Sequence, residues 1–342
     1  MSWWIILIIC GAIFFVIFII YIYKFEPFNF QLNDIRINLA LKRSGRKGKK
    51  LFTILHLSDF HLRKAFKGRR LFKFIQTLKD EEYDLIFITG DMVESQQNIE
   101  YLAEMLSSFK AMYGKYAVLG VHDHFNKGFY EFARNMFKRK RNYSTENDTS
   151  ELGRKLKEIG VEVLHNDFRK IDIPVKGMEI IELIGLGDPI IEKLDLRKAF
   201  SGIDPLGKND IVDVINFKKT RKDVFEPDSR YIHRLNKEGI LRLVLLHTPD
   251  AYAISTLYNK NVDIIFSGHT HGGQVRLPIF GALISGCRIW TRYASGLFYF
   301  KRFVLHVSKG LGEGKYSQFR CYCPPEAVKI SVYGIDKDVE NF

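Results

Sequence analysis

Five short apolar segments of this chain each end in an aspartate or a histidine, and this pattern limits the possible folds more than any other feature. The segments and the polar residues after them are 51–57 (Asp59, His61), 85–88 (Asp91), 116–119 (His122), 241–246 (His247) and 262–266 (His269, His271). Short apolar runs bounded by glycine and polar residues are typical of buried strands, and helical spacing recurs at 71–78 and 99–106. Alternation of strand and helix predicts an α/β fold.

The strongest local motif is residues 263–273, in which Gly268 precedes His269 and His271 and two glycines follow them. Glycine on both sides lets the backbone turn sharply enough for the two imidazoles to converge. Neutral imidazoles are common ligands for zinc, manganese and iron. Taken alone, the motif fits equally well a polar turn with two solvated histidines.

The other strand ends decide between these two interpretations. Buried parallel strands place ligands at their carboxyl ends, so side chains that follow several strands are expected to meet. The mixture of carboxylate and imidazole suits borderline divalent metals. Two such ions close together are a standard device for hydrolysis at phosphorus, and Asp91, on a tight glycine turn, is the expected bridging ligand.

Composition limits the partners. The chain has 342 residues, of which 46% are apolar, so it can bury one large α/β core or two small ones. Its net charge of +13 indicates an anionic partner, which is a membrane surface, a nucleic acid or a phosphorylated substrate. The four cysteines form neither a zinc pattern nor a disulfide framework, which favours a reduced compartment.

The chain begins with an uncharged apolar stretch. Residues 3–23 are long enough to cross a hydrocarbon core of about 30 Å as a helix, and tryptophan and tyrosine stand at both ends. A cleaved signal peptide is the rival interpretation. No basic residue precedes the stretch, no small-residue cleavage site follows it and no twin arginine is present, which favours a membrane anchor.

The residues after the anchor predict its orientation. Residues 24–50 contain eight Lys and Arg against two Asp and Glu, a difference of +6. The positive-inside bias places the large domain on the cytoplasmic side of the inner membrane, where the charge contacts anionic lipids. No nucleic-acid motif accompanies the charge, so nucleic acid is not an expected partner. We therefore expect a transmembrane anchor (1–23), a basic juxtamembrane linker (24–50) and one folded domain (51–342).

Two long segments are less informative. Residues 125–142 mix aromatic and basic side chains, and they fit either a solvated amphipathic helix or a cap that touches the membrane or covers a substrate. Residues 188–229 are charged and irregular, and we expect them to form a surface insertion.

The ordered motifs resemble those of the calcineurin-like metallophosphoesterase family. They are Asp59-x-His61, Gly90-Asp91, Gly120-x-His122-Asp123, His247 and Gly268-His269-x-His271, and the resemblance covers residues 51–333. The stretches 272–278, 293–297, 307–312 and 323–326 resemble the membrane-associated bacterial branch of that family. The resemblance implies a four-layer α/β/β/α sandwich and two divalent metal ions, with Mn²⁺ as the first expectation and Fe or Zn as alternatives.

The resemblance also implies a role for each residue. One metal would be bound by Asp59, His61, Asp91 and His271, and the other by Asp91, His247 and His269. His122 would contact the phosphate and protonate the leaving group, with Asp123 orienting it. The chain departs from the family at Val121, where an asparagine normally binds the second metal. We therefore expect a weaker second site with three protein ligands, unless His124 or Asp123 reaches the ion.

The resemblance implies a membrane-anchored hydrolase of a phosphorylated lipid or lipid-linked sugar nucleotide. The reaction that best fits an inner-membrane anchor and a basic cytoplasmic face is hydrolysis of UDP-2,3-diacylglucosamine to UMP and 2,3-diacylglucosamine 1-phosphate, in lipid A biosynthesis. A general phosphodiesterase or phosphatase acting on another lipid is the second expectation. A catalytically inactive, metal-stabilised binding module is the third, and His122 argues against it because such a module needs no proton donor.

Overall fold

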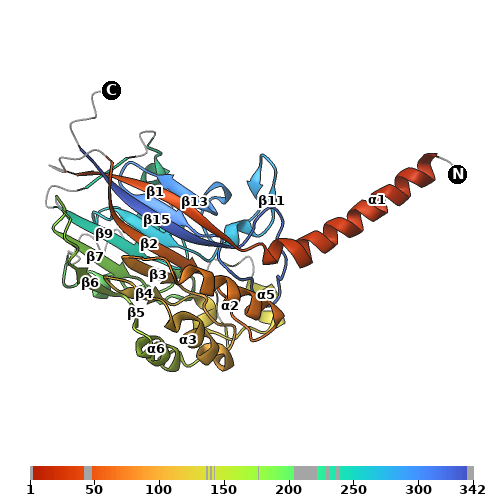
Figure 1. The fold of residues 1–342 in the computed structure, drawn as a ribbon, viewed down its shortest axis with the longest axis horizontal. Helices are drawn as coiled ribbons and strands as arrows, with labels where there is room; N and C mark the ends of the chain where they lie inside the picture. The colour runs from red at the N-terminus through yellow and green to blue at the C-terminus, as the bar shows by residue number, and fades with distance from the viewer. Residues whose placement is uncertain are drawn as a thin grey trace.

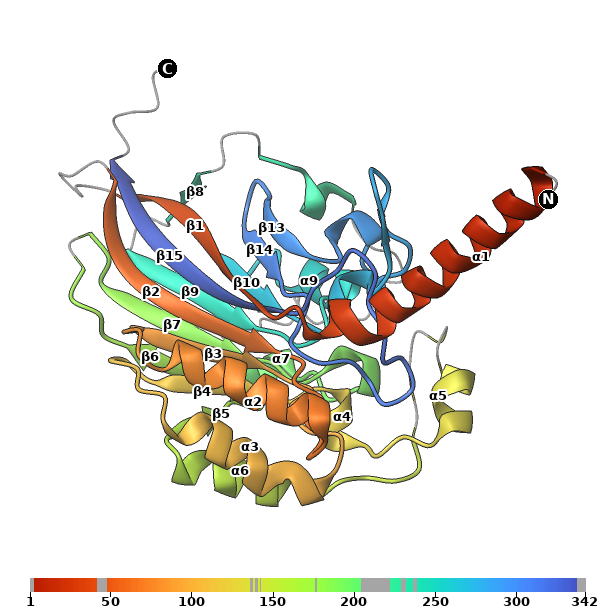
Figure 2. The ribbon, with the colours of Figure 1, turned by 45° about the vertical axis from the view of Figure 1, so that its right-hand side comes forward.

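The computed structural model describes residues 3–41, 48–135, 138, 141, 143–175, 177–203, 222–228, 232–235 and 239–336. Two β-sheets lie face to face, and each is covered by helices on its outer face (Figures 1 and 2). The order of layers is helix, sheet, sheet, helix. The expected four-layer α/β/β/α sandwich is confirmed.

The first sheet has seven strands in the order β5-β4-β3-β2-β15-β1-β8. Strands β2 to β5 are parallel to one another, whereas β15 is antiparallel to β2 and parallel to β1. The strands are β1 (Gln31–Leu41), β2 (Lys49–Ser58), β3 (Leu85–Thr89), β4 (Lys115–Val118), β5 (Val161–Val163), β8 (His233–Arg234) and β15 (Glu326–Asp336). The helices on its outer face are α2 (Phe66–Leu78), α3 (Ile99–Ser107) and α6 (Thr149–Glu158).

The second sheet has six strands in the order β13-β14-β10-β9-β7-β6. They are β6 (Asp167–Ile171), β7 (Ile180–Gly185), β9 (Ile240–Leu245), β10 (Ile264–Ser267), β13 (Gly296–Tyr299) and β14 (Val304–Val307). Its outer face is covered by α7 (Leu196–Ala199) and α9 (Ala251–Thr256). A separate hairpin is made of β11 (Arg276–Leu277) and β12 (Gly281–Ala282), and the short helices α4 (Val121–His124) and α5 (Phe129–Asn135) follow β4.

The largest apolar cluster fills the space between the two sheets. Leu39, Ile54 and Phe87 of the first sheet pack there with Leu243 and Phe266 of the second, and all five are buried. Burial of an apolar side chain of this size stabilises the fold by about 1.5–3 kcal/mol. This core holds the two sheets at a fixed separation, and therefore also fixes the distance between the loops at their ends.

The folded domain begins earlier than residue 51, so the expected linker at 24–50 is wrong over most of its length. Residues 31–41 form β1, which pairs with β15 along its whole length, and residues 49 and 50 already belong to β2. The apolar residues of β1 alternate with polar and charged ones, as in a strand with one buried face. Residues 42–47 lie outside the described residues.

Two other segments also differ from expectation. The segment 188–229 is not a surface insertion at its start, because Asp188 is buried and α7 contributes Leu196, Ala199 and Phe200 to the core of the second sheet. Residues 204–221 lie outside the described residues. In the segment 125–142 the described helix is the short α5, whose Phe129 and Phe132 rings lie 5.4 Å from the ring of Tyr316.

The chain starts with helix α1 (Trp3–Ile20), which projects away from the sandwich (Figures 1 and 2). It continues through a π-helical turn (Tyr21–Phe25) and a 3₁₀ turn (Glu26–Phe28). The helical segment Trp3–Phe28 has 26 residues and contains an 18-residue window with a mean hydropathy of 3.3, and no residue of α1 is buried by the rest of the described chain. By length and composition, α1 is able to cross a bilayer.

Leu39→Ala tests the place of β1 in the core. The variant should lose about 2–5 kcal/mol of unfolding free energy, because it leaves a cavity between the sheets. Asp34→Ala is the matched control on the exposed side of the same strand, and it should change stability by less than about 0.5 kcal/mol. Denaturant unfolding of both variants gives the comparison. Equal stability of the two variants would contradict the placement of β1.

Candidate metal centre

The predicted site residues come together where the carboxyl ends of both sheets meet. Asp59 and His61 follow β2, Asp91 follows β3, and His122 follows β4, so the first sheet supplies one half of the site. The second sheet supplies His247 after β9, and His269 and His271 after β10. Because β2, β3 and β4 are parallel, and β9 and β10 are parallel, each group of loops leaves its sheet at the same edge.

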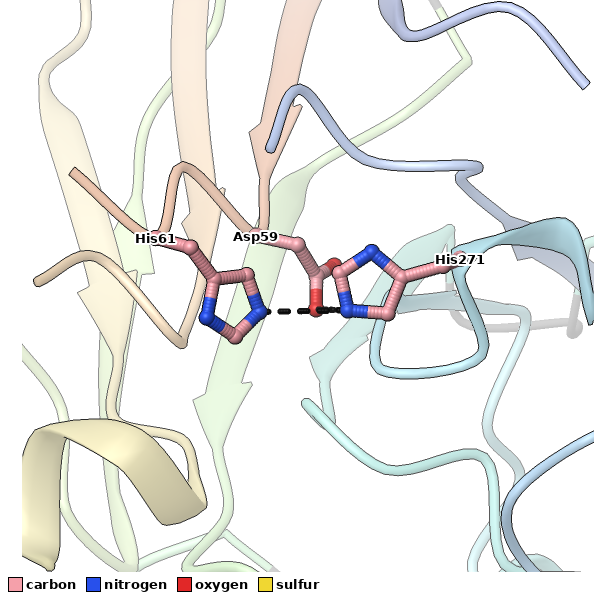
Figure 3. A group of neighbouring side chains, drawn as sticks. All are labelled: Asp59, His61 and His271. Atoms are coloured by element: carbon pink, nitrogen blue, oxygen red, sulfur yellow. Dashed lines mark hydrogen bonds and ion pairs between the residues drawn. The ribbon is translucent and has the colours of Figure 1, made fainter. Parts of the chain in front are cut away.

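The first ligand group contains Asp59, His61 and His271, whose ligand atoms all lie within 4.8 Å of one another. Figure 3 shows the three side chains turned toward a common point from two separate loops. Nε2 of His61 lies 3.1 Å from Nε2 of His271, and Nε2 of His271 lies 3.7 Å from Oδ1 of Asp59. The three ligand atoms are close enough together to hold one cation.

The second ligand group contains Asp91, His247 and His269, also within 4.8 Å of one another. Oδ2 of Asp91 lies 3.3 Å from Nε2 of His247 and 3.7 Å from Nε2 of His61, which belongs to the first group. One carboxylate oxygen therefore faces both groups. This position supports the predicted role of Asp91 as the bridging ligand.

In three of the imidazoles, the ring nitrogen that faces away from the centre takes part in a hydrogen bond. Nδ1 of His61 lies 2.6 Å from Oε1 of Glu94, Nδ1 of His247 lies 2.6 Å from the Thr89 carbonyl, and Nδ1 of His271 lies 3.0 Å from the Gly312 carbonyl. Because an acceptor fixes the proton on Nδ1, the lone pair of Nε2 points into the centre.

Two buried nitrogen atoms in the centre lack a hydrogen-bond partner. They are Nε2 of His247 and Nδ1 of His269, and the statement covers the residues that the structure describes. An unpartnered buried polar atom is costly unless something else satisfies it. Both atoms belong to the second ligand group, so one divalent cation there would satisfy them, and the convergent atoms of Asp59, His61 and His271 could hold another.

The backbone at the site is held in an unusual conformation. Asp59, His61, Asp91, His269 and His271 have φ angles of 51°, 43°, 50°, 66° and 48°, in the left-handed region that residues with a side chain rarely adopt. Such conformations cost of order 1–3 kcal/mol each and occur mainly at functional sites. Space is also tight, because a Cβ atom on Gly120 would lie 2.3 Å from Oδ1 of Asp91.

The charges of the centre are strongly coupled. Burial raises the pKa of Asp59. Burial alone would also raise the pKa of Asp91, but His247 and His122 hold it well below its usual range. In the same way, burial opposes the charge on His247, while Asp91 raises its pKa to about 10. Asp91 therefore favours the protonated form of His247, and a divalent ion bound at this position would displace that proton.

His122 and Asp123 occupy different surroundings. Burial is the main cause that lowers the pKa of His122, to about 4, and its Nδ1 lies 3.3 Å from Oε1 of Glu94. Asp123 accepts hydrogen bonds from the backbone N–H groups of Gly120, Met92 and Val93. Both of its oxygens are thus used to hold the loops together. We expected Asp123 to orient His122, but the carboxylate beside the His122 ring is that of Glu94.

Glu94 is the residue that the sequence analysis missed. It joins His61 and His122 in a third group of closely spaced ligand-type atoms, and one of its oxygens also accepts a hydrogen bond from the Lys315 N–H. Burial alone would raise its pKa, but His122 and His61 lower it far below the usual range. The sequence feature that could have identified Glu94 is its position three residues after Asp91, on the same tight loop.

Val121 is buried in an apolar pocket with Phe125, Ile190 and Ile191. His124, one of the two residues considered as a replacement ligand, is not part of any ligand group in the described chain, although its buried Nε2 has no hydrogen-bond partner there. Asp123, the other residue considered, is engaged by backbone N–H groups. The second ligand group therefore has three protein ligands.

Glu94→Gln tests the connection between the ligand group and His122. Loss of the carboxylate charge should weaken Mn²⁺ binding about 10–100-fold, since a partner behind a ligating histidine sets its orientation and basicity. Equilibrium dialysis of Mn²⁺ measures the effect independently of activity. Glu104→Gln, on the exposed face of α3, is the control. Unaltered affinity in the Glu94 variant would show that Glu94 does not support the site.

Val121→Asn tests the departure at the second ligand group. The amide should supply a fourth ligand and tighten the second Mn²⁺, but its burial among apolar side chains should destabilise the metal-free protein by roughly 1–3 kcal/mol. Val121→Leu has a similar shape without a ligand oxygen and serves as the control. In thermal unfolding, the increase in Tm on adding Mn²⁺ should be larger for Asn than for Leu or Val. An equal increase in all three proteins would contradict the prediction.

Comparison with known proteins agrees with this geometry. The sequence profile of calcineurin-like phosphoesterases matches residues 52–273, which contain both ligand groups. The metallophosphoesterase YkoQ of Bacillus subtilis is 26% identical over 299 residues, covering 84% of this chain and 89% of YkoQ. The UDP-2,3-diacylglucosamine pyrophosphatase LpxG of Chlamydia trachomatis is 24% identical over 338 residues, covering 88% of each chain.

The phosphodiesterase YaeI of Escherichia coli is 24% identical over 314 residues, covering 91% of this chain and 92% of YaeI. These relatives match nearly the whole length of the chain, and the family profile spans more than half of it. The chain therefore belongs to the calcineurin-like phosphoesterase family, and it is a hydrolase of phosphoester bonds.

Proposed function

We propose that this protein hydrolyses the diphosphate of UDP-2,3-diacylglucosamine at the inner membrane, releasing UMP and 2,3-diacylglucosamine 1-phosphate. The observation that carries the proposal is the pair of ligand groups that meet at Asp91 and lie beside His122. Two relatives at 24% identity are UDP-2,3-diacylglucosamine pyrophosphatases, and they cover most of the chain. Their similarity supports the choice of substrate.

The two metal ions are expected to be Mn²⁺, with Fe or Zn as alternatives. Asp59, His61, Asp91 and His271 would hold one ion, and Asp91, His247 and His269 the other. When bound, such ions supply Lewis acidity that activates water and neutralises phosphate oxygens. The buried carboxylates and the unpartnered nitrogens of the centre support this assignment.

His122 is suited to act on the leaving oxygen of the substrate. Glu94 engages Nδ1, so Nε2 is the nitrogen that can face the substrate, and the side chain is 15% exposed. Donation of a proton from Nε2 requires the imidazolium form of His122, whose charge Glu94 stabilises. Asp91 accepts a hydrogen bond from the His122 N–H at 2.7 Å, so the backbone position of His122 is tied to the bridging ligand. A phosphate is already a fair leaving group, so the proton from His122 should contribute less here than in the hydrolysis of an alkyl diester.

Two basic side chains, Lys127 and Arg141, lie near the centre. The ammonium group of Lys127 lies 5.1 Å from the centroid of the Tyr143 ring, and burial lowers its pKa to about 8. Nη2 of Arg141 donates to the Gly286 carbonyl, and a Cβ atom on Gly286 would lie 3.7 Å from Nε2 of His269. These cations favour an anionic substrate with more than one phosphate.

The anchor completes the proposal. We infer that helix α1 spans the inner membrane once with the catalytic domain on the cytoplasmic side, an orientation supported by the excess of basic residues over 24–50 in the sequence. The base of α1 is fixed to the catalytic domain, because Glu26 is buried and accepts a hydrogen bond from the Cys323 N–H at 2.7 Å. A lipid-linked substrate would therefore meet the catalytic domain at the membrane surface.

A second candidate function is that of a general phosphodiesterase. The similarity to the phosphodiesterase YaeI favours it, since YaeI covers as much of the chain as LpxG does. Both functions use the same ligands and His122. They differ in whether the acyl chains and the nucleotide are required.

The decisive test is hydrolysis by the full-length protein in detergent with Mn²⁺. UDP-2,3-diacylglucosamine should yield UMP and a diacyl sugar phosphate, whereas the deacylated sugar nucleotide should react much more slowly. Mass spectrometry identifies both products. The His122→Ala variant should lose about 10²-fold in kcat, at the lower end of the usual range for general acid catalysis, and removal of Mn²⁺ with a chelator should abolish turnover until the metal is restored. Equal rates for the acylated and deacylated substrates would assign the general phosphodiesterase activity instead.

A further inference from the structure

The β11–β12 hairpin exposes a continuous apolar surface. The eleven residues between Arg276 and Arg288 contain no charge. Ile279 and Phe280 at the tip are 101% and 81% exposed, and Leu283 and Ile284 after β12 are 54% and 57% exposed. Single exposed apolar residues are normal, but a contiguous group of large ones on a projecting element marks an interaction site.

The backbone of the hairpin holds these side chains outward. Ile279 has a φ angle of 72°, a conformation that is a genuine outlier for a β-branched residue, and Gly281 follows with a φ of 74°. Ala282 of β12 is buried, and a Cβ atom on Gly273 would lie 2.5 Å from its Cβ. The base of the hairpin is therefore packed against the domain, while its tip is presented to the surroundings.

Main-chain hydrogen bonds connect the hairpin to the base of α1. The Arg276 N–H donates to the Cys321 carbonyl at 3.0 Å, and the Cys321 N–H donates to the Gln274 carbonyl at 2.9 Å. The preceding residue, Arg320, donates its N–H to the Ile22 carbonyl at 3.0 Å. Figure 1 shows the hairpin standing clear of the two sheets near the point where α1 leaves them.

Exposed aromatic residues continue the apolar surface around the base of α1. Tyr23 and Phe25 of the π-helical turn are exposed, and so is Tyr322, which follows Cys321 in the connecting segment. Aromatic rings of this kind are enriched at the level of lipid headgroups. The hairpin thus extends a surface whose central element is already long and apolar enough to enter a bilayer.

We propose that the tip of the β11–β12 hairpin inserts into the bilayer leaflet from which α1 emerges. This inference rests on the proposed membrane anchor. The partner is the lipid surface itself, because apolar side chains at the tip and aromatic ones around α1 are the chemistry of an interfacial anchor. Two contacts of one domain with one leaflet also fix the orientation of the domain, which a single helix does not.

Because the hairpin is close to the ligand loop, its insertion would also position the metal centre relative to the membrane. The hairpin begins five residues after His271, and Nη1 of Arg276 donates to the Gly272 carbonyl at 2.9 Å. The ligand loop of the first metal group is therefore fixed to the base of the hairpin. Insertion of the tip holds the centre close to the headgroups, where the phosphates of a lipid-linked substrate lie.

Fluorescence of the Phe280→Trp variant of the full-length protein tests the insertion directly. The protein is reconstituted in vesicles of phosphatidylglycerol and phosphatidylcholine whose acyl chains are brominated. The emission added by the introduced indole, relative to the unsubstituted protein, should be strongly quenched by the brominated lipid and little quenched by aqueous iodide. Met112→Trp is the matched control, because Met112 is 73% exposed just before β4, at the end of the strands opposite the metal centre.

The opposite pattern overturns the proposal. If iodide quenches the added emission of the Phe280→Trp variant as strongly as that of the Met112→Trp variant, and brominated lipid does not, the tip lies in water. If the indole at the hairpin tip is shielded from iodide in lipid-free detergent as well, and light scattering shows a dimer that Phe280→Asp dissociates, the hairpin is an interface between two copies of the chain.

Activity gives a second measurement. Phe280→Asp should lower kcat/KM for a lipid-linked substrate in vesicles by about tenfold or more and leave hydrolysis of a soluble aryl phosphodiester unchanged, with Met112→Asp as the control. Equal loss on both substrates, or loss on neither, contradicts the proposal. Failure of the unsubstituted protein to release UMP would reject the proposed substrate, while the quenching result would still decide the insertion.

Discussion

Two buried carboxylates, Asp59 and Asp91, are the constraint on which the rest of the site depends. Removing a charge from water costs several kcal/mol even after relaxation, and two like charges at one centre add their mutual repulsion. Backbone N–H groups of His269 and His122 offset part of this cost by donating to Asp59 and Asp91. Cations between the carboxylates and the inward-facing imidazoles would offset the rest. The left-handed turns and the close-packed glycines hold these groups at that spacing.

The centre is also a junction between the two sheets. Neither of the two groups assigned to metal ions comes from one sheet alone, because Asp59 and His61 need His271 from the other sheet, and His247 and His269 need Asp91. The apolar cluster between the sheets sets the distance between these partners. Binding of metal therefore stabilises the contact of the two halves, and the stability of the fold and the affinity for metal are linked.

The loop 309–323 connects the metal centre to the base of α1. Arg320 is fully buried and donates to Glu313 and to the carbonyls of Lys309, Gly310, Gly312 and Cys323. The Gly312 carbonyl is also close to Nδ1 of His271, and the Arg320 N–H donates to the base of α1. One buried guanidinium thus supports both a metal ligand and the attachment of the anchor. The position of the site relative to α1 follows from this shared support.

The sequence by itself determined the α/β alternation and the apolar helix at the start, and it named six candidate metal ligands and His122, which the structure brings together. These features are local, since a strand, its turn and the polar residue after it are encoded within about ten neighbouring positions. It did not reveal that β1 completes the first sheet, because the evidence lies in pairing with β15 at the other end of the chain.

Only the tertiary structure showed that Glu94, rather than Asp123, contacts His122, that Val121 sits in an apolar pocket, and that the β11–β12 hairpin lies beside α1. Each of these depends on which distant segments the core brings into contact, and a sequence pattern carries no distance between such segments.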